Sequence, residues 1–189
     1  MCIFPRMASA GLIVTFEEVG ADVVATLSGS FAALPTPANN ANAILRNRVA
    51  GGLPYFDATD QPSGTSVNLN DYPFVPLNSF PDFGTSSTII NADTSTANTS
   101  VFLNVARVSL VPSYVPGTSF SGALTWTGQS FASLSLTPGS YVGTLSNAET
   151  VTFNIGSGPA PVPEPGTWAA AALLVGGAAF MRWRKRRSA

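Results

Sequence analysis

Residues 12–31 have the sequence LIVTFEEVGADVVATLSGSF, and this stretch decides the fold class. Leu12, Val14 and Phe16 alternate with other residues, and the same two-residue period returns from Val23 to Phe31. Such a period places every second side chain on one face of a β-strand. Gly20-Ala21-Asp22 between the two segments supplies turn residues. We therefore predict a β-hairpin with one buried face, as is typical of antiparallel sheets.

The same alternation recurs in the C-terminal third of the chain. Apolar residues alternate from Phe120 to Trp126, and residues 141–145 can pair with residues 151–155 across a short turn. Thr137-Pro138-Gly139-Ser140 fits a type II turn, because Pro is second and Gly is third. Residues 101–111 form the longest strand candidate, and apolar residues on both of its faces predict a central strand with Arg107 at a rim.

These segments together predict an all-β fold. Roughly eight to ten short strand candidates, separated by turn signals, are typical of a sandwich. We predict a single antiparallel β-sandwich over residues 11–155, followed by a flexible Gly/Pro linker over residues 156–162. Residues 163–189 are then a C-terminal segment with one transmembrane helix.

The middle of the chain is less regular. Residues 38–49 fit either a short helix capped by Asn or a strand from Ala43 to Val49. Tyr55-Phe56 fits a short edge segment. Residues 57–81 are rich in Pro, Asn and Asp, which predicts short strands or packed loops. Residues 86–100 are rich in Ser, Thr and Asn and predict a surface loop.

The Asp and Asn residues of the middle region raise the question of a calcium loop. Calcium loops need several oxygen ligands at defined spacing. Asp57-x-x-Asp60 and Asn68-x-Asn70-Asp71 match no such loop, and no acid closes either one. Asp and Asn also cap turns, so we expect solvated turns here and no metal site.

Charge and composition argue against several classes of function. Only 10% of the residues are charged and 45% are hydrophobic, which is enough for one folded domain with a core. From Gly11 to Pro165 there are ten acids and three bases, Arg46, Arg48 and Arg107, and an acidic domain argues against nucleic acid as a partner. The chain has no His and one Cys, Cys2, so Ser-His-Asp catalysis and imidazole metal ligands are excluded.

Paired carboxylates are the remaining catalytic arrangement, as in glycosidases. The candidates are Glu17, Glu18, Asp57, Asp60, Asp71, Asp82, Asp93 and Glu149. Glu17 and Glu18 are adjacent on one strand, so they point to opposite faces and cannot flank a substrate. The other acids lie in turn-like contexts, where we expect solvation. We therefore predict no enzyme activity, no catalytic residue and no cofactor.

Two classes of non-enzymatic function remain. The first is an exported surface or matrix protein. The second is a carbohydrate-binding module that stacks sugars on exposed aromatic rings, with Tyr55, Tyr72, Tyr114 and Trp126 as candidates. Trp126 alternates with polar residues and is expected to face the core. A planar row of exposed rings would favour the second class, and burial of these rings would favour the first.

The C-terminal tail has three parts in a fixed order. Val162-Pro163-Glu164-Pro165 comes first, and an uncharged apolar stretch follows from Thr167 to Met181. As a helix this stretch would span about 22 Å, which is short for a hydrocarbon core of ~30 Å. Trp168 and Trp183 flank it, as suits the membrane interface. A basic cluster follows that should stay cytoplasmic, namely Arg182, Arg184, Lys185, Arg186 and Arg187.

This order of motif, apolar stretch and basic end resembles the PEP-CTERM sorting signal of Gram-negative bacteria. The resemblance covers about the last 28 residues of the chain. It implies that exosortase, a membrane-embedded transpeptidase-like enzyme, recognises residues 162–165 and cuts nearby. The chain would be held in the inner membrane for a time, with its N-terminal domain outside the cytoplasm, and then reach the cell surface or exterior. The resemblance also implies an association with exopolysaccharide or biofilm material. The alternative is a plain single-span anchor that is never processed.

The N-terminus fits part of a secretory signal. Ala8-Ser9-Ala10 matches the small-residue cleavage pattern, with Ala8 and Ala10 as its key positions. Residues 1–7 contain no apolar segment of the usual length, so we expect residues 1–10 to be the remnant of a signal peptide whose start lies upstream. The alternative is that Met1 is the genuine start and the tail alone enters the membrane. Cleavage after Ala10 would remove Cys2 and leave a mature domain without disulfides.

Overall fold

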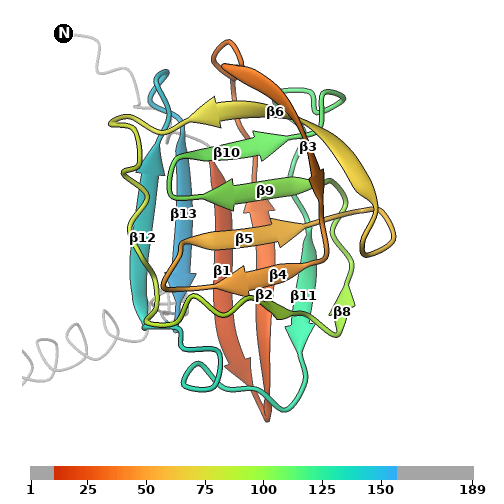
Figure 1. The fold of residues 1–189 in the computed structure, drawn as a ribbon, viewed down its shortest axis with the longest axis vertical. Helices are drawn as coiled ribbons and strands as arrows, with labels where there is room; N and C mark the ends of the chain where they lie inside the picture. Colours follow the sequence, from red (N-terminus) through yellow and green to blue (C-terminus); the bar gives the residue numbers. More distant parts are fainter. Residues whose placement is uncertain (1–10, 157–189) are drawn as a thin grey trace, which may run out of the picture. The chain divides into compact units, whose positions relative to one another are not determined.

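Two β-sheets packed face to face make up the part of the chain that the computed structural model describes, residues 11–156 (Figure 1). The six-stranded sheet contains, in spatial order, β12 (Gly139–Thr144), β13 (Thr150–Ile155), β1 (Leu12–Val19), β2 (Asp22–Gly29), β11 (Gly122–Trp126) and β8 (Thr94–Ser95). The seven-stranded sheet contains β3 (Asn39–Ile44), β6 (Ser66–Pro73), β10 (Arg107–Leu110), β9 (Val101–Asn104), β5 (Tyr55–Ala58), β4 (Arg48–Ala50) and β7 (Ile90–Asn91). The all-β prediction is confirmed for these residues, while the tail and its predicted helix lie outside them.

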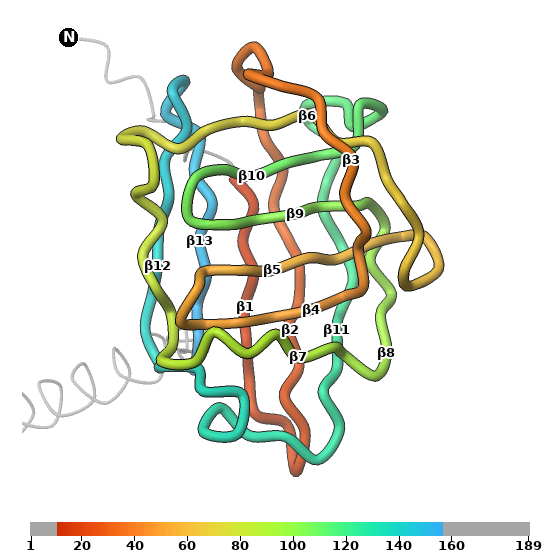
Figure 2. Tube along the Cα trace, in the orientation of Figure 1, coloured from red at the N-terminus to blue at the C-terminus, as the bar shows by residue number. Residues whose placement is uncertain are grey.

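The strands of one sheet run crosswise over those of the other (Figures 1 and 2). This arrangement belongs to the crossed class of sheet packing rather than the aligned class. The predicted hairpins are both present: β1 pairs with β2 in antiparallel register, and β12 pairs with β13 with Tyr141 opposite Phe153. Along β13, and along β1 from Leu12 to Glu17, fully buried side chains alternate with less buried ones, which follows the two-residue period of the sequence.

One strand pair departs from the antiparallel prediction. β1 and β13 pair in parallel, with Val14 opposite Phe153 and Phe16 opposite Ile155. A hairpin forces its two strands to be antiparallel, whereas strands joined by a long connection can pair in either sense. Because almost the whole domain lies between β1 and β13, the connection imposes no direction on this pair. The first and last strands of the domain thus lie side by side near the middle of one sheet (Figure 2).

Aromatic rings fill the space between the sheets. The Phe153 ring contacts four other phenylalanines, with centroid distances of 5.9 Å to Phe16, 5.3 Å to Phe56, 5.3 Å to Phe80 and 5.1 Å to Phe83. All five side chains are at most 1% exposed. Such pairs contribute about 0.5–1.5 kcal/mol each beyond the burial of their surface. This cluster brings together rings from both sheets and from the loop that follows β6, so it joins the two layers.

The predicted central strand over residues 101–111 is wrong. The chain turns back after Asn104, and β9 and β10 form a hairpin with Asn104 opposite Arg107. The Asn104 side-chain oxygen accepts the backbone N–H groups of Ala106 at 2.9 Å and Arg107 at 3.1 Å. Asn competes for backbone donors in this way and favours turns. Apolar residues on both sides of Asn104 conceal the turn in the sequence.

Three further expectations for the middle region change in the structure. Tyr55-Phe56 is not an edge segment, because β5 lies between β9 and β4. Residues 38–49 form two strands rather than a helix or a single strand, and the break falls near Asn47, whose φ is 60°. Asn is one of the few residues that adopt this left-handed conformation at low cost. The predicted loop over residues 86–100 contains two short edge strands, β7 and β8.

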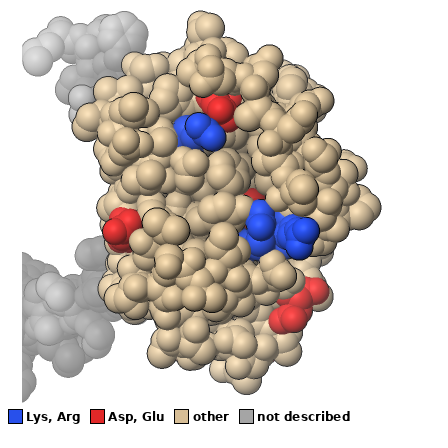
Figure 3. Space-filling view, in the orientation of Figure 1, with Lys and Arg blue, Asp and Glu red and all other residues tan. Residues whose placement is uncertain are grey.

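A small second core lies on the outer face of the seven-stranded sheet. Leu45, Val67 and Leu69 are buried there, and Phe102 and Val111 pack against them. β3 pairs with β6 and contributes Ala43 to this cluster. Figure 3 shows this side of the molecule, where basic side chains lie beside acidic ones on an otherwise uncharged surface. The outer face of this sheet therefore combines a small apolar cluster with a few charged side chains.

Candidate functional site

Asp57 is the most enclosed acid among the described residues. It lies on β5, and its side chain is 0% exposed. Its Oδ1 accepts the backbone N–H groups of Arg46 and Arg48, both at 3.0 Å. Its Oδ2 accepts Nε of Arg48 and the hydroxyl of Tyr55, both at 2.8 Å. The Asp57 carboxylate thus accepts four hydrogen bonds, from residues of the β4–β5 hairpin and from Arg46 just before it.

Tyr55 completes this cluster. Its hydroxyl also accepts a hydrogen bond from Nη2 of Arg48, and the guanidinium carbon lies 5.1 Å from the ring centroid. Burial, and then the charge of Asp57, raises the pKa of the Tyr55 phenol above its ordinary value, and Arg48 opposes that shift. Tyr55 is therefore held by its polar end and is not a free stacking platform.

Asp71 is the second buried acid on this face. It lies on β6 at 3% exposure, directly opposite Ser109 of β10. Its Oδ1 accepts the Ser109 hydroxyl at 2.6 Å, and Oδ2 lies 3.4 Å from Nε of Arg107. The second contact is an ion pair without hydrogen-bond geometry. Arg107 was expected at a rim, and it lies half-buried beside this carboxylate.

Glu149 is the third buried acid, at 7% exposure, in the turn before β13. Its Oε1 accepts the backbone N–H groups of Ala32 at 2.9 Å and Ala33 at 3.2 Å. Its Oε2 is buried and has no hydrogen-bond partner among residues 11–156. Glu149 therefore ties the β12–β13 turn to the segment that leaves β2.

The expectation of solvated, turn-like acids is wrong for these three residues. Asp57 and Asp71 lie within strands, and Glu149 is enclosed in its turn. The other candidate acids, Glu17, Glu18, Asp60, Asp82 and Asp93, are exposed. Glu17 and Glu18 are consecutive residues near the end of β1, and both line a cavity together with Phe131 and Gly156. That they point to opposite faces remains a prediction from strand geometry. Across the described residues, no three acidic side chains converge as a group of metal ligands.

The candidate aromatic platforms do not form an exposed row. Trp126 is fully buried, as expected, and its indole nitrogen donates to the Ile90 carbonyl at 3.3 Å. Tyr72 is 5% exposed and belongs to the main core. Tyr55 is engaged with Arg48 and Asp57, as described above. Tyr114 borders an open cavity.

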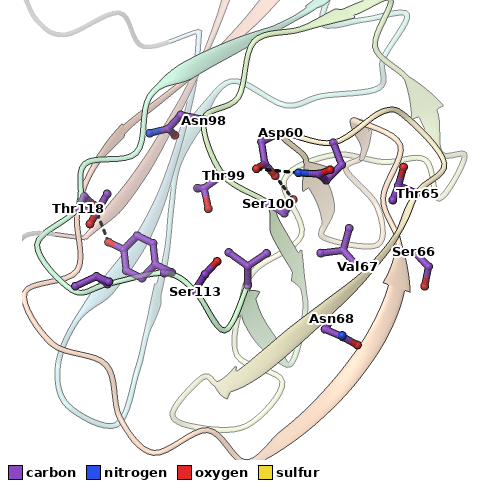
Figure 4. A pocket seen from close by; sticks show the side chains of 14 residues that line it. Asp60, Thr65, Ser66, Val67, Asn68, Asn98, Thr99, Ser100, Ser113 and Thr118 are labelled. Atoms are coloured by element: carbon purple, nitrogen blue, oxygen red, sulfur yellow. Dashed lines mark hydrogen bonds between the residues drawn. The ribbon is translucent and has the colours of Figure 1, made fainter.

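That cavity is a groove of about 450 Å³, which we call the Tyr114 groove (Figure 4). Three separate segments line it: residues 60–68, residues 98–100 and residues 111–118. Figure 4 shows Thr118 and Asn98 on one side of the groove and Thr65 and Ser66 on the other, with Asp60 and Ser100 between them. Hydroxyl and amide side chains predominate in the lining.

Asp60 is the one charged residue of the described lining. Its Oδ1 accepts the hydroxyl of Ser100 at 2.6 Å, and its Oδ2 accepts Nε2 of Gln61 at 3.2 Å. Ser100 is fully buried, and its oxygen lies 2.8 Å from that of Thr59. Sequence reasoning missed this arrangement, because Thr59 and Ser100 are far apart in the chain.

Tyr114 is fixed within the groove by contacts on several sides. Its ring stacks on Phe120 with a centroid distance of 4.9 Å and an interplanar angle of 9°. Its hydroxyl donates to the Thr118 carbonyl at 2.8 Å and accepts the backbone N–H of Phe31 at 3.1 Å. Burial raises the pKa of the Tyr114 phenol, the Phe31 hydrogen bond opposes this, and the charge of Glu149 adds to it.

The predicted sorting signal and the predicted cleavage residues lie outside the described residues. These are Val162 to Pro165, Thr167 to Met181, Arg182 to Arg187, and Ala8 with Ala10. Over residues 11–156 there is no helix long and apolar enough to cross a membrane. Comparison with known proteins gives no match to any family model, any curated protein or any solved structure.

Proposed function

We infer that the chain is a non-enzymatic exported surface or matrix protein, delivered by its C-terminal sorting signal. The observation that carries this proposal is the order of Pro163-Glu164-Pro165, the uncharged stretch from Thr167 to Met181, and the basic end from Arg182 to Arg187. Apolar spans followed by Lys and Arg keep those basic residues in the cytoplasm. The proposed partner is exosortase. The chain is held in the inner membrane for a time, and it associates with exopolysaccharide outside the cell.

The short span suits a transient anchor. Thr167 to Met181 would cover about 22 Å as a helix, against ~30 Å for the hydrocarbon core. Gly176-Gly177 lowers its helix propensity further. A marginal span can hold the chain long enough for processing, and it is a weak permanent anchor.

The contacts of the acids support a non-enzymatic role. A glycosidase needs two carboxyl groups facing each other across an open site. Asp57 and Asp71 are both buried. Asp57 accepts hydrogen bonds from Arg48 and Tyr55. Asp71 accepts one from Ser109 and forms an ion pair with Arg107. Asp60 is the one acid that lines the Tyr114 groove. These contacts support a structural role for Asp57 and Asp71.

Charge supports a partner other than nucleic acid. Residues 11–156 contain nine acids and three arginines. Nucleic-acid affinity depends on a basic surface that neutralises phosphates. Two of those arginines, Arg48 and Arg107, are already paired with Asp57 and Asp71.

Mass spectrometry of the native exterior protein tests this proposal. We expect a mature C-terminus near residues 162–166 and loss of everything after it. A native exterior protein that retains Arg184 to Arg187 would refute sorting by cleavage and favour a plain anchor. The same spectrum gives the mature N-terminus and tests cleavage after Ala10.

A further inference from the structure

We propose that the Tyr114 groove binds a short stretch of a neutral polysaccharide. The groove is open along one side, and its volume of about 450 Å³ lies within the range of ligand pockets, about 300–1,000 Å³. This proposal concerns the folded domain alone, and it does not depend on how the chain is sorted or cleaved.

The charge of the groove selects the class of ligand. Asp60 is the one charged side chain of the described lining, and no basic residue accompanies it. A phosphate, nucleic acid or polyuronate would meet a carboxylate and no cation, so the groove disfavours anions. One carboxylate also gives little ligand charge for a calcium ion, whose affinity depends on the number of charged ligands. A neutral ligand rich in hydroxyl groups fits this chemistry.

Asp60 is aligned before any ligand arrives. The buried Ser100 hydroxyl donates to Oδ1 at 2.6 Å, and Ser100 is itself within hydrogen-bond distance of Thr59 at 2.8 Å. A carboxylate offers about four acceptor positions, and the contacts with Ser100 and Gln61 use two. The remaining positions can accept sugar hydroxyls, and hydrogen bonds to a charged acceptor are the stronger kind.

Unused polar groups surround this carboxylate. The side chains of Asn68, Thr99, Ser113 and Thr118 line the groove and make no hydrogen bond within the described part of the chain. Amides and hydroxyls both donate and accept, which matches the paired donor and acceptor character of sugar hydroxyls. They come from the same three segments that form the walls, so a bound chain would touch all of them.

Tyr114 supplies the apolar contact that sugar rings also need. Its position is set by the Phe120 stack and by the hydrogen bonds with Thr118 and Phe31. Tyr presents a large, rigid surface that loses little conformational entropy on binding. A prealigned ring, a prealigned carboxylate and free polar groups therefore lie in a single concavity.

The test uses the full chain in a detergent that has no sugar headgroup. Ligand-observed NMR titrations would employ three neutral hexasaccharides, from cellulose, chitin and dextran, and a hexameric alginate as the anionic probe. We expect saturable binding of at least one neutral probe, with Kd on the order of 1 mM, and none of alginate. Asn68→Ala should weaken binding about threefold or more, and Asp60→Asn about tenfold or more.

Asn91→Ala is the matched control, because Asn91 is exposed on β7 and lies outside the groove lining. Thermal unfolding of all variants checks that they fold, and Asp60→Asn retains an oxygen that can accept the Ser100 hydroxyl. An Asn91→Ala variant that binds like the unmodified chain supports the proposal. No saturation by any neutral probe up to ~10 mM would overturn it, and so would equal losses in Asn68→Ala and Asn91→Ala.

Discussion

Arg48 and Asp57 face one another across the β4–β5 hairpin, with Nη2 of the guanidinium 2.6 Å from Oδ2 of the carboxylate. The carboxylate is fully buried, while the Arg48 side chain remains 18% exposed. The same carboxylate accepts two backbone N–H groups where the chain enters β4. One side chain therefore satisfies the charge of Arg48 and orders the bend between β3 and β4.

We expect Asp57→Ala to lower the free energy of unfolding by about 3–5 kcal/mol. Removing one partner of a buried ion pair leaves the other charge uncompensated, and here it also strips two backbone donors of their acceptor. Urea unfolding measures the change. Asp82→Ala is the control, since Asp82 is exposed and has no hydrogen bond or ion pair in the described structure, and it should change stability by less than about 0.5 kcal/mol. Equal effects of the two substitutions would refute this account of Asp57.

Stability should fall in alkaline solution because of Tyr55. Its phenol pKa is raised in the folded state, mainly by burial. Above the unfolded pKa of about 10, the unfolded chain loses this proton while the folded chain retains it. The unfolded state then binds fewer protons, so the free energy of unfolding decreases as pH rises. This contribution is fully present below pH ~10 and is lost above it.

Urea unfolding of the unmodified chain and of Tyr55→Phe, measured between pH ~8 and ~11, tests this expectation. Tyr55→Phe should be less stable at neutral pH, because Asp57 loses one donor, but its stability should decline less steeply with pH. Identical slopes for the two proteins would exclude Tyr55 as the source. Tyr114 adds a decline of the same sign, since its pKa is also raised, and that part should persist in the variant.

Gly143 on β12 lies directly beneath two core rings. A Cβ atom there would lie 2.5 Å from Cδ2 of Phe80 and 2.6 Å from Cε1 of Phe74. We expect Gly143→Ala to cost about 1–3 kcal/mol of unfolding free energy through overpacking. The neighbouring exposed residue gives the control, with Val142→Ala expected to cost less than about 0.5 kcal/mol. A neutral effect of Gly143→Ala would mean that Phe74 and Phe80 can move apart freely.

The sorting proposal predicts a clear retention phenotype. We expect the Glu164→Ala variant to remain full-length. We expect the same of a variant with neutral residues in place of the Arg182 to Arg187 cluster. Either protein should stay in the inner membrane or be inserted in the wrong orientation. Immunoblots of membrane and exterior fractions measure this. Glu17→Ala is the matched control, because Glu17 is exposed on β1 and makes no hydrogen bond in the described structure. Normal release of the Glu164→Ala variant would argue against the motif as the processing signal.

The alternation of apolar residues along the sequence was sufficient to predict the β1–β2 and β12–β13 hairpins. The two-residue period of residues 12–31 corresponds to β1 and β2, and residues 141–155 correspond to β12 and β13. Both hairpins are closed by short turns, so their pairing depends on neighbouring residues alone. The Asn104 turn shows the limit of this approach, because a single polar residue in an apolar run can be either an exposed strand position or a turn.

Long-range partners explain what the sequence could not predict. Asp71 is buried because Ser109 and Arg107 lie on the strand beside it, and Asp60 is aligned by Ser100. An acid that is buried with such partners has the same local sequence as a solvated one in a turn. The Tyr114 groove likewise joins three distant segments, so no motif marks it.

The parallel pair of β1 and β13 also determines how the domain responds to mechanical load. β13 lies between β12 and β1 and is paired with both along its length. A pull on residue 156 along the axis of β13 would shear both ladders at once, rather than open one hydrogen bond after another. A chain tethered by its C-terminal end would thus resist force through a strand that is paired on both sides. Because β13 lies inside the six-stranded sheet, that sheet is complete only when the chain as far as Ile155 is present and paired.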